Sequence, residues 1–192
     1  MRIALLASLL AVQACGYHLA GSNVALPEDV KSIHVGKLGN DSAYPGLEKM
    51  LGFALEDAIS RWGKLRVADD AGGSDATLGG RIAAVDLYAV SFDQNDLALQ
   101  YQWSVVADLY LRRNSDGKVL WQIDGLRQSD EYSAVAQVIV TSSEQFQQGT
   151  LDAQNLPNFT EVQLAESEGR IAMNRLLKDM ARDAYALMTE GF

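Results

Sequence analysis

The chain has 192 residues, of which 16 are Lys or Arg and 25 are Asp or Glu, so its formal net charge at pH 7 is −9. Nucleic-acid binding needs basic surface against the phosphates, and this acidic balance excludes nucleic acid as the partner. Hydrophobic residues make up 48% of the sequence, which is too many for a disordered chain. We therefore expect a folded domain.

The first fourteen residues have the pattern of a secretory signal peptide. Arg2 supplies a positive charge, and residues 3–12 are apolar except for Ser8. This run is too short to remain as a membrane-spanning helix, which needs about 20 residues. The next residues, Val-Gln-Ala-Cys, resemble the bacterial lipobox, in which an aliphatic and a small residue precede an acylated cysteine. The sequence predicts a signal peptide at 1–14 and one tethered domain at 15–192.

Cys15 is the only cysteine in the sequence. Exported proteins use cysteines in pairs, as disulfides, and a lone thiol is a liability in an oxidising compartment. Lipidation removes the liability because the sulfur becomes a thioether; an unmodified cysteine in an ordinary signal peptide is the alternative. Each buried methylene contributes about 0.8 kcal/mol, and two or more chains anchor a protein firmly. We predict that Cys15 is the lipidated N-terminus.

The first half of the domain reads as a strand, a helix and two extended segments. Residues 31–38 alternate apolar and polar side chains, as in a short strand. Pro45 suits the first turn of a helix, and Gly63 suits the position just past its end. The two extended segments, 64–70 and 75–92, are predicted to be parts of one strand that is interrupted at Gly72-Gly73. The predicted apolar face of the helix consists of Leu47, Leu51, Ala54, Leu55, Ala58, Ile59 and Trp62.

The second half contains the clearest alternation in the chain. Residues 101–111 place one face toward a core and the other toward mixed surroundings, as in a half-exposed antiparallel strand. Asp116-Gly117 is a strong hairpin signal, and 118–133 returns as the partner strand. In the segment 134–158, residues 134–141, "AVAQVIVT", either prolong the strand or begin a helix, whereas 142–158 are polar and Gln-rich; the role of the segment is open. The predicted core face of the first strand consists of Tyr101, Trp103, Val105, Ala107, Leu109 and Leu111.

The chain closes with an amphipathic helix. Thr160 and Gln163 fit a capping box at its start. Its predicted apolar face consists of Ala165, Ala172, Leu176, Met180, Ala184 and Leu187. The element order β-α-β-β-β-α predicts an α+β fold of two layers, a four-stranded mixed sheet with both helices packed on one face.

The sequence offers no constellation for catalysis. His18 and His34 stand without acidic or cysteine residues at metal-ligand spacing, and no nucleophile motif or phosphate-binding loop is present. Asp69-Asp70 reads as a solvated loop rather than an acid–base pair. Gly72-Gly73 and Gly79-Gly80 indicate bends or close backbone approaches. We predict no enzyme activity, no cofactor and no metal.

Aromatic residues are concentrated on the two hairpin strands. Tyr101, Trp103, Tyr110 and Trp121 are first interpreted as core and cross-strand pairs. The alternative is a surface that binds a ligand or a partner. Both interpretations stay open at this point.

Several segments together resemble a known family. They are "CGYHLAG" after the signal, with Cys15, Gly16, Tyr17 and Leu19 as its compact motif, then "LPEDVKSIHV", a helix near "PGLE", the "YQWSVVADLYL" strand with its "GKVLW" return, and the last helix. This pattern resembles the lipopolysaccharide-assembly lipoprotein family LptE. The resemblance implies an outer-membrane lipoprotein that plugs the LptD β-barrel, assists its assembly and binds lipopolysaccharide. It also implies two helices on one side of a four-stranded sheet.

The sequence departs from the family at one loop. Family members carry basic residues for lipopolysaccharide near a sheet-edge loop, but here the loop before the 101–111 strand, "SFDQNDLALQ", is acidic. No basic site is carried over to it. The nearest cations are Arg112, Arg113 and Lys118 around the hairpin turn, which we predict to contact lipid A phosphates or core sugars. Ordinary solvated hairpin charges are the alternative interpretation.

Two other classes of function compete with this one. The main alternative is a lipid-anchored periplasmic binding module of another envelope or polysaccharide-export complex. The other is a lipoprotein enzyme, which the missing catalytic residues disfavour.

Overall fold

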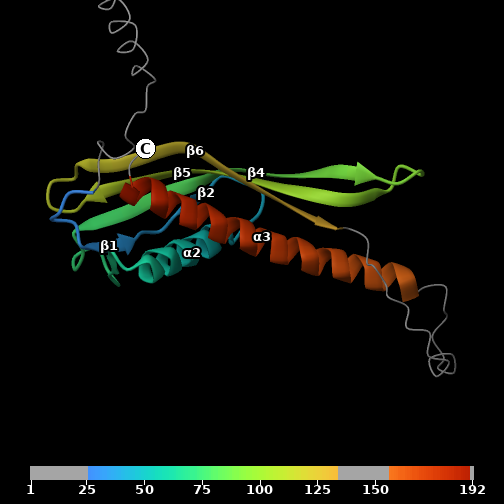
Figure 1. The fold of residues 1–192 in the computed structure, drawn as a ribbon, viewed down its shortest axis with the longest axis horizontal. Coiled ribbons are helices and arrows are strands. Elements are labelled where there is room, and N and C mark those ends of the chain that lie inside the picture. The colour runs from blue at the N-terminus through green and yellow to red at the C-terminus, as the bar shows by residue number, and fades with distance from the viewer. Residues whose placement is uncertain (1–25, 134–155, 191–192) are drawn as a thin grey trace, which may run out of the picture.

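The computed structural model describes residues 26–133 and 156–190. Its elements are β1 (Ser32–Val35), β2 (Gly39–Asn40), α2 (Leu47–Trp62), β3 (Arg66–Val67), β4 (Ala76–Phe92), β5 (Ala98–Arg113), β6 (Val119–Ser133) and α3 (Leu156–Glu190). The strands form one mixed sheet in the order β3-β1-β4-β5-β6, with β2 also beside β4. Both helices lie against the same face of this sheet (Figure 1). The predicted two-layer α+β fold is confirmed.

The sheet has six strands rather than the predicted four. The two additional strands, β2 and β3, are only two residues long, which is why the sequence did not predict them. The predicted strand 31–38 contains only β1, and β2 begins just after it at Gly39; both pair in parallel with β4. Between them, the Gly36 N–H still donates to the Leu78 carbonyl, at 2.9 Å. The extended segment predicted at 64–70 contributes only β3, which pairs with β1. Short flanking pairings of this kind carry too few residues to leave a periodic signal.

The first helix matches its prediction except at the two ends. Gly63 ends α2 in the left-handed conformation, with φ +71°, as expected for this position. Pro45 lies in the turn before the helix rather than inside it. The predicted apolar face is buried from Leu47 to Ile59, but Trp62 is 58% exposed. Trp62 is the last helical residue, and its ring lies beside Tyr185 of α3 with centroids 6.4 Å apart.

The second helix is longer than the sequence indicates. It begins at Leu156, so Thr160 lies inside α3 and the predicted N-cap at Thr160 is wrong. Residues 134–155 of the segment 134–158 lie outside the described residues. The predicted face is buried at Ala172, Leu176, Met180 and Ala184, while Leu187 is only half-buried. A second buried row, not predicted, consists of Met173, Leu177, Ala181, Tyr185 and Met188. It is buried because α3 packs against α2 as well as the sheet.

The antiparallel strands β4, β5 and β6 form the largest part of the sheet. On β5 the predicted core face is confirmed at Val105, Ala107, Leu109 and Leu111, which are fully buried. Gly117, with φ +72°, supports the predicted hairpin turn. At Gly80 the neighbouring strand passes so close that a Cβ atom would lie 2.2 Å from the Asp108 carbonyl oxygen. The close approach predicted for the Gly79-Gly80 pair is therefore present.

A carboxylate joins the parallel and antiparallel parts of the sheet. Asp75, just before β4, accepts hydrogen bonds from the Lys31 and Ser32 N–H groups at 2.9 Å each and from the Ser32 hydroxyl at 2.8 Å. The Lys31 N–H is the main reason that the pKa of Asp75 is lowered. Asn114 of the hairpin turn makes a similar connection, because its amide donates to the Ala71 and Ser74 carbonyls at 2.9 Å. The Asp75 carboxylate thus holds the start of β1 to β4, and the Asn114 contacts position the hairpin tip.

Candidate functional site

Some of the predicted functional features fall outside the described residues. The signal peptide at 1–14 and Cys15 both lie there, so lipidation stays a prediction. Within residues 26–133 and 156–190, no helix is both long enough and apolar enough to cross a membrane. The same residues contain no cluster of three or more potential metal-ligating side chains. His34 is half-buried, and its Nδ1 lies 3.1 Å from the Ala68 carbonyl oxygen.

The hairpin cations Arg112, Arg113 and Lys118 are close in sequence but differ in their surroundings. Arg113 has 22% of its side chain exposed, and its guanidinium forms ion pairs with Asp116 at 3.2 Å and Asp29 at 3.3 Å. Arg112 instead lies over the ring of Tyr110, 5.7 Å from its centroid. Two carboxylates already neutralise Arg113, which leaves Arg112 and Lys118 as the cations available to an anionic ligand.

The sheet face opposite the helices is mostly polar. Side chains alternate between the two faces along each strand, so the residues between the buried ones of β5, and their partners in the pairing register, lie on this face. They are Arg81, Asp86, Tyr88, Gln102, Ser104, Val106, Asp108, Tyr110, Gln122, Asp124, Arg127, Ser129 and Glu131. Tyr110 crosses over Gly79, where a Cβ would meet its ring at 2.6 Å. We call these residues the polar sheet face.

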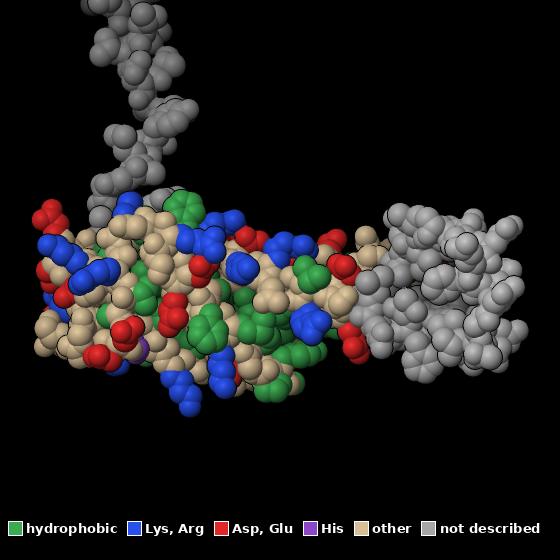
Figure 2. Space-filling model, turned by 90° about the horizontal axis from the view of Figure 1, so that it is seen from below, with side chains coloured by type: hydrophobic (Ala, Val, Ile, Leu, Met, Phe, Trp, Pro, Cys, Tyr) green, Lys and Arg blue, Asp and Glu red, His purple; other side chains and the backbone are tan. Residues whose placement is uncertain are grey.

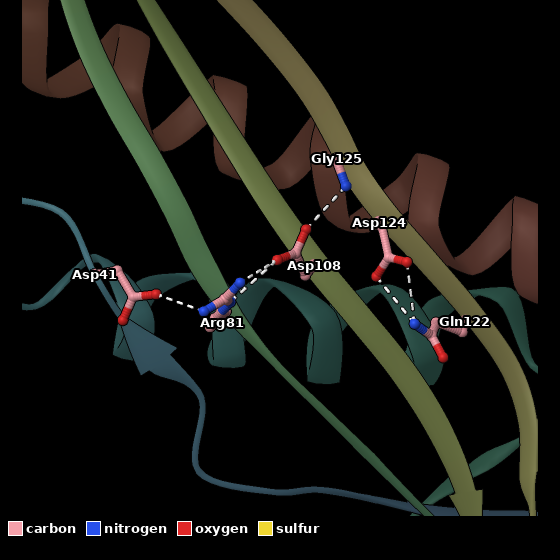
Figure 3. A network of polar contacts seen from close by, with 6 residues as sticks. All are labelled: Asp41, Arg81, Asp108, Gln122, Asp124 and Gly125. Atoms are coloured by element: carbon pink, nitrogen blue, oxygen red, sulfur yellow. Dashed lines mark hydrogen bonds and ion pairs between the residues drawn. The ribbon is translucent and has the colours of Figure 1, made fainter.

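A row of charges crosses the polar sheet face from one strand to the next (Figure 3). Arg81 on β4 bridges Asp41, at 2.9 Å, and Asp108 on β5, at 3.0 Å. Asp108 also accepts the Gly125 N–H of β6 at 2.9 Å, and this bond, followed by Arg81, lowers the pKa of Asp108. Exposed ion pairs add little stability. Their effect is to fix the positions of charges on this face of the sheet.

A cleft opens on the other side of the sheet, where the start of α2 faces α3. It has a volume of about 310 Å³ and is mainly apolar; its lining includes Tyr44, Leu47, Trp103, Tyr132, Ala165, Gly169, Arg170 and Met173. Trp103 holds α3 at this point, because its indole N–H donates to the Gly169 carbonyl at 3.1 Å. Tyr44 meets the Trp103 ring edge to face, with centroids 5.1 Å apart. We call this pocket the aromatic cleft.

The aromatic residues predicted on the hairpin strands therefore separate. Trp103 lines the aromatic cleft and Tyr101 stacks on Tyr132, 5.8 Å between centroids, while Trp121 packs against the core. Tyr110 lies on the polar sheet face. Burial raises the pKa of Tyr132, so this phenol stays neutral. The sequence analysis missed Tyr44 and Gly169. A glycine inside the helical pattern was the available signal for Gly169, since a Cβ there would press on the Tyr132 ring at 3.0 Å.

Large hydrophobic side chains are also exposed outside the cleft. Hydrophobic side chains gather near the middle of the face in Figure 2. Independently of that view, four large exposed hydrophobic side chains belong to one strand, β4: Leu87, Tyr88, Val90 and Phe92. Leu97 is also exposed and follows in the turn to β5. Consecutive side chains of a strand point to opposite faces: Leu87 pairs with Trp103 on the helix side and Tyr88 pairs with Gln102 on the polar sheet face, so these exposed side chains flank β4 on both faces.

Comparison with known families decides the identity of the fold. The family model of lipopolysaccharide assembly, LptE, matches residues 30–188, most of the chain. The chain belongs to the LptE family. The matched range includes every described strand and α2 of this LptE family member, and α3 extends past its end as far as Glu190.

Solved structures resemble this LptE family member at low identity, and no curated protein matches its sequence. Lipoprotein B of Nitrosomonas europaea is 17% identical, with a TM-score of 0.46, covering 86% of this chain and 88% of the other. The PelC dodecamer subunit of Paraburkholderia phytofirmans is 13% identical, with a TM-score of 0.43, covering 84% and 92%. With TM-scores below 0.5, these structures carry no part of the functional argument.

Proposed function

We propose that this LptE family member is an outer-membrane lipoprotein of the lipopolysaccharide translocon, tethered through Cys15 on the periplasmic side. In this role it plugs an LptD-type β-barrel in a 1:1 complex, assists assembly of the barrel and binds lipopolysaccharide during its insertion into the outer leaflet. The role is structural and binding, without catalysis or a cofactor. The family match over residues 30–188 supports assembly of lipopolysaccharide as the process.

The polar sheet face is the observation that supports the plug. The interior of a large membrane barrel is lined with polar side chains, so a plug must present polar surface to it. The charge row from Asp41 through Arg81 to Asp108 provides such a surface, with its charges fixed by contacts of 2.9–3.0 Å. The apolar faces of the two helices, by contrast, are buried in the core. We therefore assign the polar sheet face to the barrel wall.

Charge reversal on this face should weaken the complex without unfolding the domain. Asp124→Lys and Glu131→Lys change exposed side chains of β6 that do not contribute to the core. A reversed charge opposite a complementary one costs enough to lower affinity by about tenfold or more. The measurement is recovery of the barrel with the tagged full chain from detergent-solubilised membranes, beside thermal melting of each variant.

Glu168→Lys is the control, because Glu168 is equally exposed but lies on α3, on the opposite side of the molecule. It should leave barrel recovery unchanged. Equal losses for all three variants, or none, would argue against a plug that uses the polar sheet face. Recovery of a different envelope complex by the unmodified chain would favour the alternative, a binding module of another envelope or polysaccharide-export system.

The aromatic cleft and the hairpin cations suit different parts of lipopolysaccharide. The cleft is mainly apolar, so it suits an acyl chain; of its two charged lining residues, Arg170 suits a phosphate and Glu166 does not. Arg112 and Lys118 suit phosphates or core sugars. Arg112 lies nine positions after Trp103 on β5, roughly 30 Å away at the rise of an antiparallel strand. We therefore propose two separate contact regions.

Two variants should affect lipopolysaccharide binding differently. Ala165→Trp fills the cleft and should lower affinity severalfold at every salt concentration, since apolar burial is not screened. Arg112→Ala with Lys118→Ala should lower affinity at low salt and reduce its salt dependence, because fewer cations are screened. Arg113 is left in place because its ion pairs join the hairpin to Asp29. Binding of purified lipopolysaccharide is measured across a salt series, and unchanged low-salt binding would exclude the region that was altered.

A further inference from the structure

The strand β4 continues well beyond its parallel neighbours. β1 pairs with it as far as Leu78 and β2 as far as Ile82. From Ala84 to Phe92, β4 is paired with β5 on one side, and among the described residues no strand lies on the other. In Figure 1 this part of β4 and β5 extends away from the compact end that carries β1 and α2. We call this stretch the free β4 edge.

The backbone groups that face outward on the free β4 edge follow from the register. The Leu78 and Ile82 carbonyls accept hydrogen bonds from the Gly36 and Asp41 N–H groups, so these alternate residues of β4 point away from β5. One extra residue is inserted between Ile82 and Ala84, which shifts the alternation by one. The outward N–H and C=O groups of the free edge therefore belong to Val85, Leu87 and Ala89.

The free β4 edge has register shifts only at its two ends, between Ile82 and Ala84 and from Ala89 to Phe92, so the stretch from Ala84 to Ala89 is regular and carries little that protects an exposed strand from pairing. Natural edges are blunted by charged residues, proline or bulges. Residues 83–92, "AAVDLYAVSF", contain one charge and no proline, and Phe92 is 55% exposed. The opposite edge, β6, is protected: it carries Asp124, Arg127, Asp130 and Glu131 and is interrupted at Gly125, which has φ +72°. Of these two long edges of the described sheet, the free β4 edge is the one open to another strand.

Charge indicates what kind of strand fits. The hairpin from Ile82 to Leu111 contains Asp86, Asp93, Asp96 and Asp108 but no Lys or Arg. Asp108 is paired with Arg81, which leaves Asp86 beside the edge and Asp93 and Asp96 at the turn. A second copy of this chain would bring its own aspartates to the same place. A segment with basic residues would be attracted instead.

We propose that the free β4 edge binds an extended segment of the partner barrel as an added strand, with Lys or Arg residues of that segment near Asp86 and the Asp93–Asp96 turn. Main-chain hydrogen bonds to Val85, Leu87 and Ala89 hold the segment, and the exposed apolar side chains of β4 contact its alternate residues. The inference rests on the proposed function, because it names the part of the barrel that this surface recognises.

A matched pair of variants at Leu87 tests the main-chain contact. Leu87→Ala keeps the outward N–H, whereas Leu87→Pro removes it, and both lose the same side chain. Proline is tolerated where a strand N–H faces outward, so pairing with β5 is kept. We expect Leu87→Ala to recover the barrel within about twofold of the unmodified full chain, and Leu87→Pro to lose about tenfold or more. Ala89→Ser and Ala89→Pro form a second pair.

Hydrogen exchange of the unmodified complex is measured alongside the variants. The amides of Val85, Leu87 and Ala89 should exchange more slowly in the complex than in the free chain. If the unmodified chain recovers no barrel, the proposed function fails. If both proline variants recover the barrel as well as the unmodified chain does, or if these amides gain no protection, strand addition is overturned. A dimer of the full chain alone in detergent that Leu87→Pro dissociates would assign the edge to a second copy and overturn the barrel segment.

Discussion

Gly80→Ala is expected to destabilise the domain by about 3 kcal/mol or more. A Cβ atom at this position would lie 2.2 Å from the Asp108 carbonyl oxygen and 2.9 Å from the Leu109 Cα, so the clash is with backbone rather than a movable side chain. The backbone at Gly80 also has φ +155°, which other residues rarely adopt. Relief would require β4 and β5 to separate in the middle of the sheet. Urea denaturation followed by circular dichroism measures the loss.

Gly52→Ala is the matched control for this substitution. Gly52 lies inside α2, and no atom stands within 4 Å of an added Cβ. Alanine favours a helix over glycine, so this variant should gain about 0.5–1 kcal/mol. The two substitutions thus add the same methyl group with opposite results. If Gly80→Ala unfolded at the same urea concentration as the unmodified protein, the close approach of β4 and β5 at Gly80 would be contradicted.

Cys15→Ser is expected to abolish membrane anchoring. Serine cannot form the thioether that carries the lipid. The acyl chains anchor the protein with about 0.8 kcal/mol per buried methylene, and this anchoring free energy is lost with them. The variant should be recovered as a soluble or unprocessed chain and should not incorporate labelled palmitate. Fractionation of membranes and palmitate labelling measure both effects.

Ser22→Ala, seven residues after the cysteine, serves as the control and should remain membrane-bound and labelled. A Cys15→Ser chain that stays in the membrane fraction with its label intact would exclude lipidation at Cys15. A soluble Cys15→Ser chain that still recovers the barrel would separate anchoring from barrel recognition. The two proposals are therefore tested independently.

Sequence patterns predicted the fold where burial is regular along one element. The apolar face of α2 and the alternation on β5 follow from single periodicities, and Gly63 and Gly117 mark the helix end and the hairpin turn. The predictions failed where a second element decides burial. Trp62 lies at the end of α2 and is exposed, whereas Met173 and Leu177 are buried because α3 contacts α2 and the sheet together.

The candidate sites show the same division. Arg112, Arg113 and Lys118 could be located from their clustering, but the sequence could not reveal that Asp29, 84 residues away, pairs with Arg113. The aromatic cleft joins Tyr44 from a turn, Trp103 from a strand and Gly169 from a helix. No local pattern connects these three residues, because only the tertiary packing of α3 across the sheet brings them together.

The parallel position of β1 beside β4 constrains the order in which the domain can fold. Ile33 pairs with Ala76, 43 residues later, and α2 lies in the connection between them. The antiparallel pairs of β4, β5 and β6 close much shorter loops, and short loops lose less chain entropy on closure. The N-terminal third of the domain therefore gains its sheet partner only after a segment synthesised later has taken shape. A nascent chain that ends before β4 holds an amphipathic helix with no surface on which to bury its apolar face.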